Sequence, residues 1–118
     1  MEQRIDLDAA NAVIEEWRPQ WAAMGITASE TTWRDQSRGW PPPLLTRRAE
    51  AGDPDSVGVS LVKGAQEGSV VLFKGGWADL LFWNGADDDV ITEAPGYDDW
   101  LDLEAFARVL DRLTTAFS

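Results

Sequence analysis

The sequence predicts a single α+β domain over residues 1–118, with an N-terminal helix, an antiparallel β-meander of four to six strands and a C-terminal helix packed on the sheet. Three observations lead to this class. Apolar residues recur at helical spacing near both ends of the chain. Between them, short apolar or alternating runs are separated by glycine-containing turns. Connections this short leave no room for crossover helices, so the strands must be antiparallel.

The first helix is predicted from about Asp8 to Met24. Asp6 or Asp8 can cap its start, and Gly25 is a natural stop. Pro19 lies inside the pattern and is expected to kink or divide the helix, because proline lacks an N–H and crowds the preceding turn. The apolar residues fall three and four positions apart, as one helix face requires: Leu7, Ala10, Val13, Ile14, Trp17 and Trp21.

The middle of the chain holds the predicted strands. A strand is expected near residues 30–35, and a short edge strand within residues 44–50, after three consecutive prolines. The meander strands follow at residues 56–63, 69–74, 77–83 and 89–94, joined by turns at residues 64–68, 75–76 and 84–85. The second and third meander strands are apolar on both sides and need cover on both faces. Either the two helices lie on opposite faces, or one face meets a partner.

The closing helix is predicted over residues 101–117. Asp99 or Asp102 can cap its start, where Glu104 also suits the positive end of the helix dipole. A continuous apolar stripe runs along it: Leu103, Phe106, Ala107, Leu110, Leu113 and Phe117. Both helices therefore have one apolar face, and both are expected to pack on the sheet.

The composition excludes several kinds of catalysis and metal binding. The chain contains no histidine and no cysteine. Ser-His and Cys-His catalysis, His-ligated metals, disulfides and thiolate nucleophiles are thereby excluded. No glycine-rich phosphate loop precedes a helix, and nothing places two acids across a cleft for glycoside hydrolysis. We therefore expect a protein that is not an enzyme and uses no cofactor.

The charge balance points to a class of partner. Ten lysines and arginines against 21 acids give a formal net charge of −11. Nucleic acid and anionic membrane surfaces would repel such a chain, whereas a basic protein would meet it faster. The polar N-terminus does not resemble a secretory signal, and no apolar run reaches the length of a membrane helix. A cytoplasmic location is expected.

The acids are concentrated in one segment. Residues 75–107 contain no lysine or arginine but nine acids, with aromatic residues between them. Acids can steer and pair with a basic partner while rings supply contact area. The plainer interpretation is a solvated loop and the usual acids of a helix start. The aspartate run lacks the alternating ligands and closing glutamate of a calcium loop, so no metal site is predicted. The candidate partner-binding residues are Asp87, Asp88, Asp89, Glu93, Tyr97, Asp98, Asp99 and Trp100.

Tryptophan is unusually frequent, with seven copies. Trp77 and Trp83 alternate along one strand and share a face with Asp79. If that face belonged only to the core, Asp79 would be a buried acid in need of a cation, such as Arg34, Arg47 or Arg48. The arginines could instead answer the chain's own acids across the sheet.

The strand from Gly75 to Trp83, together with Trp100 and the closing helix at residues 103–117, resembles a known group. It is similar to small acidic immunity proteins of bacterial polymorphic toxin systems, in particular to a tryptophan-rich group called TriTu. The resemblance implies an inhibitor without catalytic activity that binds a cognate toxin domain, often a nuclease. It names no contact residue.

The hypothesis from sequence is therefore an immunity protein that neutralises a basic toxin through a stoichiometric complex; the sequence does not fix its oligomeric state, and a monomer is favoured. Two alternatives remain open. A secretion chaperone or adaptor of similar acidity would more often be a dimer with an exposed apolar groove. A small-ligand module would have a concave pocket between sheet and helix, lined by Trp77 or Trp83.

Overall fold

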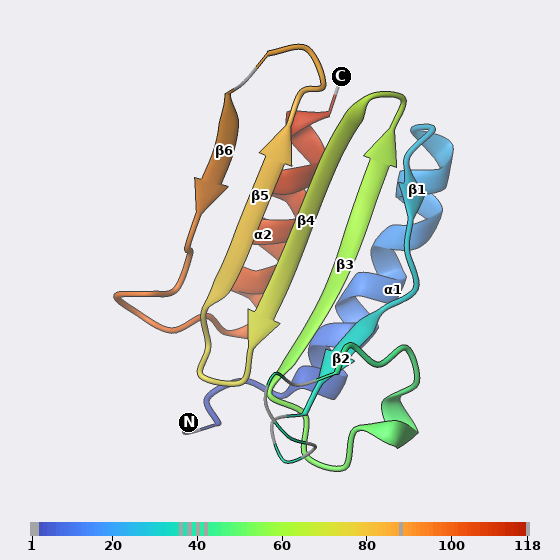
Figure 1. The fold of residues 1–118 in the computed structure, drawn as a ribbon. Coiled ribbons are helices and arrows are strands. Elements are labelled where there is room, and N and C mark those ends of the chain that lie inside the picture. Colours follow the sequence, from blue (N-terminus) through green and yellow to red (C-terminus); the bar gives the residue numbers. More distant parts are fainter. Residues whose placement is uncertain are drawn as a thin grey trace.

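Two helices and a six-stranded antiparallel sheet form the part of the chain that the computed structural model describes, which comprises residues 3–35, 37, 39, 41, 43–87 and 89–117. Helix α1 (Leu7–Ala23) precedes the sheet and helix α2 (Leu103–Ala116) follows it (Figure 1). The strands are β1 (Thr27–Ala28), β2 (Thr32–Arg34), β3 (Ser56–Lys63), β4 (Gln66–Phe73), β5 (Ala78–Trp83) and β6 (Val90–Glu93). The predicted α+β architecture is confirmed.

The sheet is a meander extended by two short strands. Strands β3, β4, β5 and β6 pair in chain order, and both β1 and β2 pair with β3 on its other side. Every pairing is antiparallel, as the short connections predict. Strand β6 is consequently one edge of the sheet (Figure 1).

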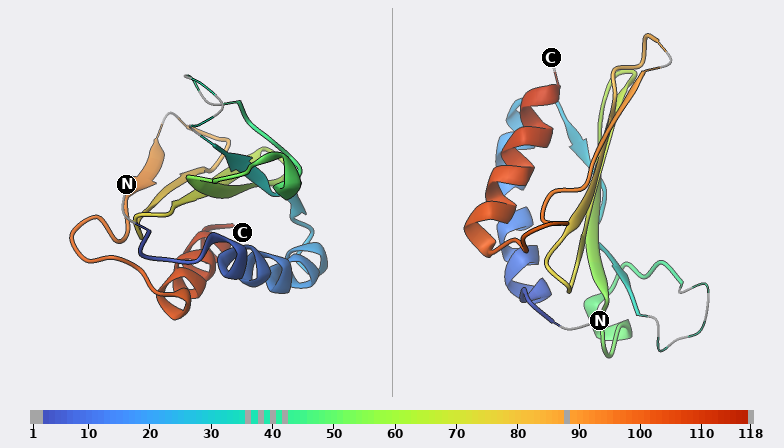
Figure 2. Two further views of the ribbon diagram at one scale, coloured as in Figure 1. Left: turned by 90° about the horizontal axis from the view of Figure 1, so that it is seen from below. Right: turned by 90° about the vertical axis from the view of Figure 1, so that its left-hand side faces the viewer.

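Both helices cover the same face of the sheet, so the alternative in which they lie on opposite faces is wrong (Figure 2). The register places Val59, Val70 and Leu80 side by side on this face. Gly68 lies in the same layer, and a Cβ there would be 2.9 Å from the Cδ1 of Leu113. The absent side chain therefore lets α2 approach β4 closely. The other face of the described sheet carries no α-helix (Figure 2).

Several predicted boundaries are wrong, each for a local reason. The turn between β3 and β4 is only residues 64–65, because Gly64 adopts a positive φ of 61° and permits a two-residue hairpin. Gln66 and Glu67, predicted as turn, thus belong to β4. The expected strand in residues 44–50 reduces to one bridge from Leu45 to Trp33, followed by a 3-10 turn.

The helix ends follow simple capping chemistry. Asp6 accepts hydrogen bonds from the N–H groups of Asp8 (2.9 Å) and Ala9 (3.2 Å), so it is the N-cap of α1. Asp102 accepts from the N–H of Ala105 at 2.7 Å and begins α2 two residues later than predicted. Pro19 does not divide α1, which continues to Ala23.

A buried hydrogen bond joins the two helices. The indole N–H of Trp21 donates to the hydroxyl of Thr114 at 2.9 Å, and this hydroxyl donates to the carbonyl of Leu110 at 2.7 Å. Trp21 is fully buried and Thr114 is 3% exposed. The polar end of a large core side chain is thus satisfied inside the apolar layer, as burial requires. Around it packs the hydrophobic core, whose largest fully buried apolar members also include Phe106, Ile14, Leu61, Leu72, Leu110 and Leu113.

We predict that Thr114→Val lowers the free energy of unfolding by about 1–3 kcal/mol, because it leaves the Trp21 N–H buried without an acceptor. Urea denaturation measures the change. Thr115→Val makes the same substitution at an exposed position of the helix and is expected to change stability by less than about 0.5 kcal/mol. Equal effects of the two substitutions would contradict the role of the Trp21 hydrogen bond.

Candidate partner-binding site

The structure divides the predicted site residues between the two ends of β6 (Figure 1). Asp87 and Asp89 lie in the turn between β5 and β6, and Asp88 lies outside the described residues. Glu93 is the last residue of β6. Tyr97, Asp98, Asp99 and Trp100 lie together in the loop that leads to α2. The sequence grouped these residues as one patch, whereas the structure brings together only the last four.

Asp87 and Asp89, the turn group, take part in hydrogen bonds within the turn itself. The side-chain oxygen of Asn84 accepts from the N–H groups of Ala86 and Asp87, at 2.9 Å and 3.3 Å. The carboxylate of Asp87 in turn accepts from the N–H of Asp89 at 2.9 Å. The indole N–H of Trp83 donates to the carbonyl of Asp87 at 2.6 Å. These bonds shape the turn, and the carboxylates remain at the surface as fixed negative charge.

The loop group, which comprises Tyr97, Asp98, Asp99 and Trp100, lines a shallow pocket of about 360 Å³. The rings of Trp77 and Tyr97 meet edge to face, with centroids 6.3 Å apart and planes at 87°. Tyr97 is 77% exposed and Trp100 is 55% exposed, which is unusual for side chains of this size. Asp98 and Asp99 complete the lining with Arg4, Gly75 and Gly96. The pocket therefore combines three rings with two carboxylates.

Two glycines allow this loop to close against the turn between β4 and β5. The N–H of Leu101 donates to the carbonyl of Gly76 at 2.6 Å, and the N–H of Ala78 donates to the carbonyl of Pro95 at 3.0 Å. Gly76 and Gly96 have positive φ angles of 91° and 86°. A Cβ on Gly96 would lie 2.5 Å from the carbonyl oxygen of Gly76. The pocket thus depends on a backbone contact that only glycine permits.

A cation already lies on one of the rings. The guanidinium of Arg4 is centred 4.4 Å from the centroid of Trp100, within the range of a cation–π contact. The backbone N–H of Arg4 donates to the carbonyl of Lys74 at 2.7 Å and fixes the N-terminal segment beside the pocket. The contact shows directly that these rings can receive a guanidinium.

The remaining acids differ in how far they are neutralised. Glu93 forms an ion pair with Arg112 at 3.1 Å, so its charge is partly answered within the chain. Among the described residues, no ion pair of Asp98 or Asp99 is found. Both residues are exposed, and both line the pocket with the exposed rings.

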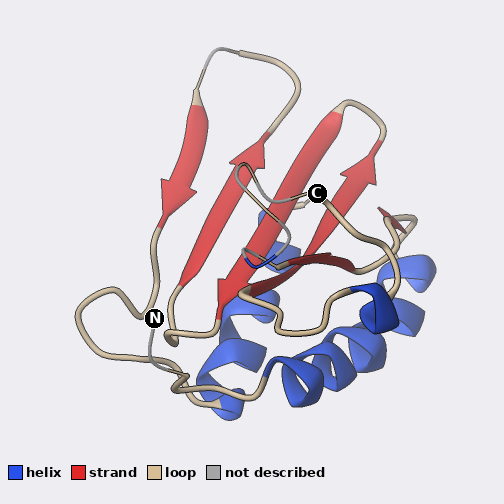
Figure 3. Ribbon diagram, turned by 60° about the horizontal axis from the view of Figure 1, so that its bottom comes forward, coloured by secondary structure: helices blue, strands red, loops and turns tan. Residues whose placement is uncertain are grey.

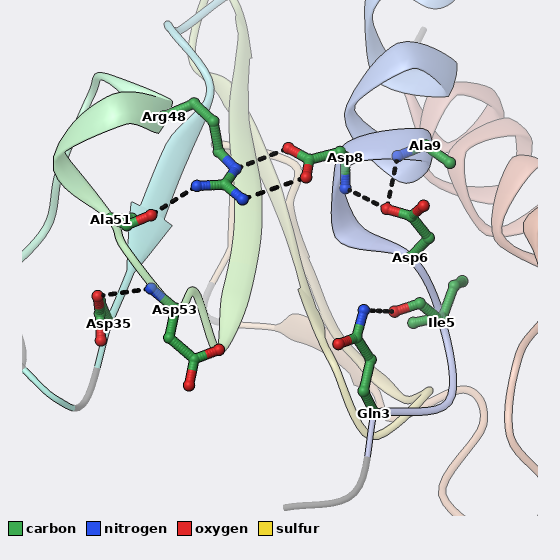
Figure 4. Close-up of polar contacts among 9 residues, drawn as sticks. All are labelled: Gln3, Ile5, Asp6, Asp8, Ala9, Asp35, Arg48, Ala51 and Asp53. Carbon is green, nitrogen blue, oxygen red and sulfur yellow. Dashed lines mark hydrogen bonds and ion pairs between the residues drawn. The ribbon is translucent and has the colours of Figure 1, made fainter.

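The arginines that were expected to pair with the chain's own acids across the sheet lie away from the acidic loop. Arg48 pairs with Asp8 at 2.6 Å and also donates to the carbonyl of Ala51 (Figure 4). The hydrogen bond from Arg48 lowers the pKa of Asp8 below its usual value of 3.8. Arg47 approaches Glu50 at 3.9 Å. Arg48 therefore holds the start of α1 to the loop before β3, whereas Arg47 pairs only within its own 3-10 turn. Both lie far in sequence from the acidic loop.

The sheet face away from the helices carries Trp77, directly before β5, and Trp83, the last residue of β5. Trp77 stacks on Phe73 with ring centroids 4.3 Å apart, and Trp83 is half-buried. Both rings lie on the side opposite the helices, so neither lines a space between sheet and helix. Asp79 shares this face and is exposed, which removes the expected need for a buried cation partner.

Sequence reasoning missed a buried carboxylate. Asp35 is 1% exposed and accepts a hydrogen bond from the N–H of Asp53 at 3.0 Å (Figure 4). It also accepts hydrogen bonds from the N–H and the hydroxyl of Ser37. The N–H of Asp53 and then the hydroxyl of Ser37 lower the pKa of Asp35 below its usual 3.8. Ser37 is only two residues away, but Asp53 comes from a distant position, so local sequence could not have shown that this carboxylate is enclosed by the loop before β3. The carboxylate ties the end of β2 to the loop before β3.

In the described residues, no three acids converge as a metal-binding group. Neither described helix is long and apolar enough to cross a membrane. Comparison of the chain with protein-family models, curated proteins and solved structures found no match.

We predict that Gly96→Ala destabilises the folded chain by roughly 1–3 kcal/mol, because alanine disfavours a positive φ and its Cβ would collide with the Gly76 carbonyl. Urea denaturation provides the measurement. Gly64→Ala is the matched control, since Gly64 also has a positive φ but has open space around it. The control is expected to lose about 1 kcal/mol from the φ preference alone. A loss at Gly96 no larger than at Gly64 would contradict the backbone contact.

We also predict that Asp35 makes stability depend on acid pH. Because its pKa is lowered in the folded chain, its contribution is complete above pH 3.8 and is lost as pH falls through the folded-state pKa. Asp35→Asn should flatten the fall in unfolding free energy as pH decreases below about 4. Asp53→Asn is the control, since it keeps the main-chain donor to Asp35. If both variants show the wild-type slope, Asp35 does not carry this dependence.

Proposed function

We propose that this chain is a cytoplasmic immunity protein that binds a basic bacterial toxin domain and neutralises it in a stoichiometric complex. The observation that carries the proposal is the pocket lined by residues 96–100, where exposed rings lie beside solvent-facing aspartates. A basic side chain entering this pocket would gain ring contact and carboxylate pairing together. Such combinations are typical of the few residues that dominate a protein interface.

The contact with Arg4 supports a cationic occupant. A guanidinium from the chain itself already lies over Trp100 at 4.4 Å. Since Tyr97 is 77% exposed and Trp77 also lines the pocket, ring area remains for a second cation. Arginine and lysine are the residues with which a toxin holds phosphate groups, so an acidic inhibitor can cover that site.

Inhibition by occupation also suits the residues available. The sequence has neither histidine nor cysteine, and the pocket is lined by rings, carboxylates, glycines and one arginine. These groups bind and orient a cation. The net charge of −11 adds long-range attraction toward a basic partner.

The direct test is the protein encoded by the neighbouring reading frame. Its C-terminal domain should arrest growth when expressed alone and lose this toxicity when this chain is expressed with it. Size-exclusion chromatography with light scattering should then find one copy of each chain per complex. A neighbouring product that is harmless, or whose toxicity this chain leaves unchanged, would refute the proposed function.

We predict that Asp98→Lys with Asp99→Lys slows association with the toxin domain at least tenfold, because it reverses the charge beside the rings. Stopped-flow or surface plasmon resonance at several salt concentrations measures the rates. Salt should slow association of the wild type steeply and affect dissociation less. Asp87→Lys with Asp89→Lys probes the turn end of β6 separately.

The matched control changes the same amount of charge elsewhere. Glu16→Lys with Glu30→Lys alters two exposed acids on and beyond α1. Net charge alone would slow this variant as much as the loop variant. An equal effect in both would exclude the loop as the contact site.

A further inference from the structure

The outer edge of β6 is the most open backbone in the described sheet. β6 pairs with β5 on one side, and in the described part of the chain no helix or strand lies beyond it (Figure 3). All four of its residues are exposed. Val90 is 47% exposed and Ile91 is 40% exposed. An edge of this kind presents unpaired N–H and C=O groups to another chain.

The register identifies which groups face outward. The N–H of Ala78 donates to the carbonyl of Pro95, which marks these two positions as a hydrogen-bonded pair. Antiparallel pairs alternate, so Glu93 and Ile91 also direct their N–H and C=O groups toward β5. The N–H and C=O groups of Val90 and Thr92 therefore point away from the sheet.

The opposite edge of the sheet is closed by the chain itself. Trp33 of β2 directs its N–H and C=O outward, and Leu45 bonds to both at 2.8 Å. The carbonyl of Ser29 accepts from the guanidinium of Arg18 at 2.8 Å. Natural sheets also protect an edge by keeping it short, or with charged residues, proline or a bulge, and of these β6 has only its four-residue length and Glu93. The sequence Val-Ile-Thr-Glu of β6 has no lysine or proline, and its register with β5 is unbroken.

The charges around β6 indicate what can pair with it. Asp87 and Asp89 lie at one end of the strand, and Asp98 and Asp99 lie in the loop beyond the other end. A second copy of this chain paired antiparallel along β6 would bring these acids against one another, which disfavours a homodimer. An extended segment rich in lysine and arginine would meet opposite charge at both ends.

We propose that β6 accepts an extended, basic segment of the partner protein as an additional strand of the sheet. Main-chain bonds to Val90 and Thr92 would hold this segment, while the flanking aspartates would select its lysines or arginines. This inference deepens the proposed function, because it names how the basic partner binds beside the aromatic pocket. It rests on the strand edge, so the two ideas are separable by experiment.

The probe is a synthetic ten-residue peptide in which lysine alternates with threonine. Its control has the same sequence and charge, but alternate backbone nitrogens are methylated so that one edge cannot donate hydrogen bonds. Titration into the ¹⁵N-labelled chain, followed by NMR and amide hydrogen exchange, reports binding residue by residue. We expect the unmethylated peptide to slow exchange at Val90 and Thr92 and to bind at least about tenfold more tightly than the methylated peptide.

Variants of the protein test the same point from the other side. Thr92→Pro removes an N–H that points away from β5, so it costs no bond within the sheet. It should weaken peptide binding about tenfold. Thr92→Val keeps the N–H and should bind as the wild type does. The methylated peptide needs no variant, so the comparison stands even if Thr92→Pro unfolds.

Several results would overturn the inference. Equal binding of the two peptides would show attraction by charge alone. Protection at α2 or at the helix-free sheet face, without protection at β6, would place the contact elsewhere. Dimerisation of the free chain that Thr92→Pro abolishes would make the occupant a second copy. If Thr92→Pro still neutralises a toxin domain, the proposed function stands and the strand edge is rejected as the contact. If β6 binds the peptide but the neighbouring gene product is not a toxin, the strand edge stands and the proposed function is rejected.

Discussion

The placement of both helices on one face of the sheet determines what the rest of the molecule can do. The apolar stripes of α1 and α2 merge over β3, β4 and β5, and the bond from Trp21 to Thr114 joins the helices inside that layer. With both helices used for one face, the other face and the β6 edge remain without a helix over them. The surface available for binding is therefore a direct consequence of how the core is built.

Much of this architecture is predictable from periodicity, and the failures have a common cause. Helical spacing predicts α1 and α2, and alternation with glycine turns predicts the four-strand meander. The strand expected near residues 30–35 is present as β2 (Thr32–Arg34), whereas β1 has two residues and is too short to carry a pattern of its own. Their pairing with β3 and the bridge from Leu45 to Trp33 are long-range events. Local sequence contains no information on such partners.

The predicted partner-binding residues do not form a single patch, and the reason is geometric. A strand advances about 3.3 Å per residue, so acids before and after β6 lie at opposite ends of it although the sequence places them close together. What the sequence could identify was the kind of residue: rings and acids without cations between them. What it could not identify was Arg4 on Trp100, or Gly76 beneath Gly96, because these contacts join residues far apart in the chain.

The separation of the acids has a physical rationale if one set of groups attracts the partner and another set holds it once it is bound. Charge acts over a Debye length and speeds encounter, but exposed ion pairs contribute little to the lifetime of a complex. Rings and main-chain bonds act only on contact and oppose dissociation. An exposed strand edge would ordinarily invite self-association. If β6 pairs with a basic segment as proposed, the aspartates at its two ends would repel a second copy and attract that segment, so the same charges would protect the edge and select its partner.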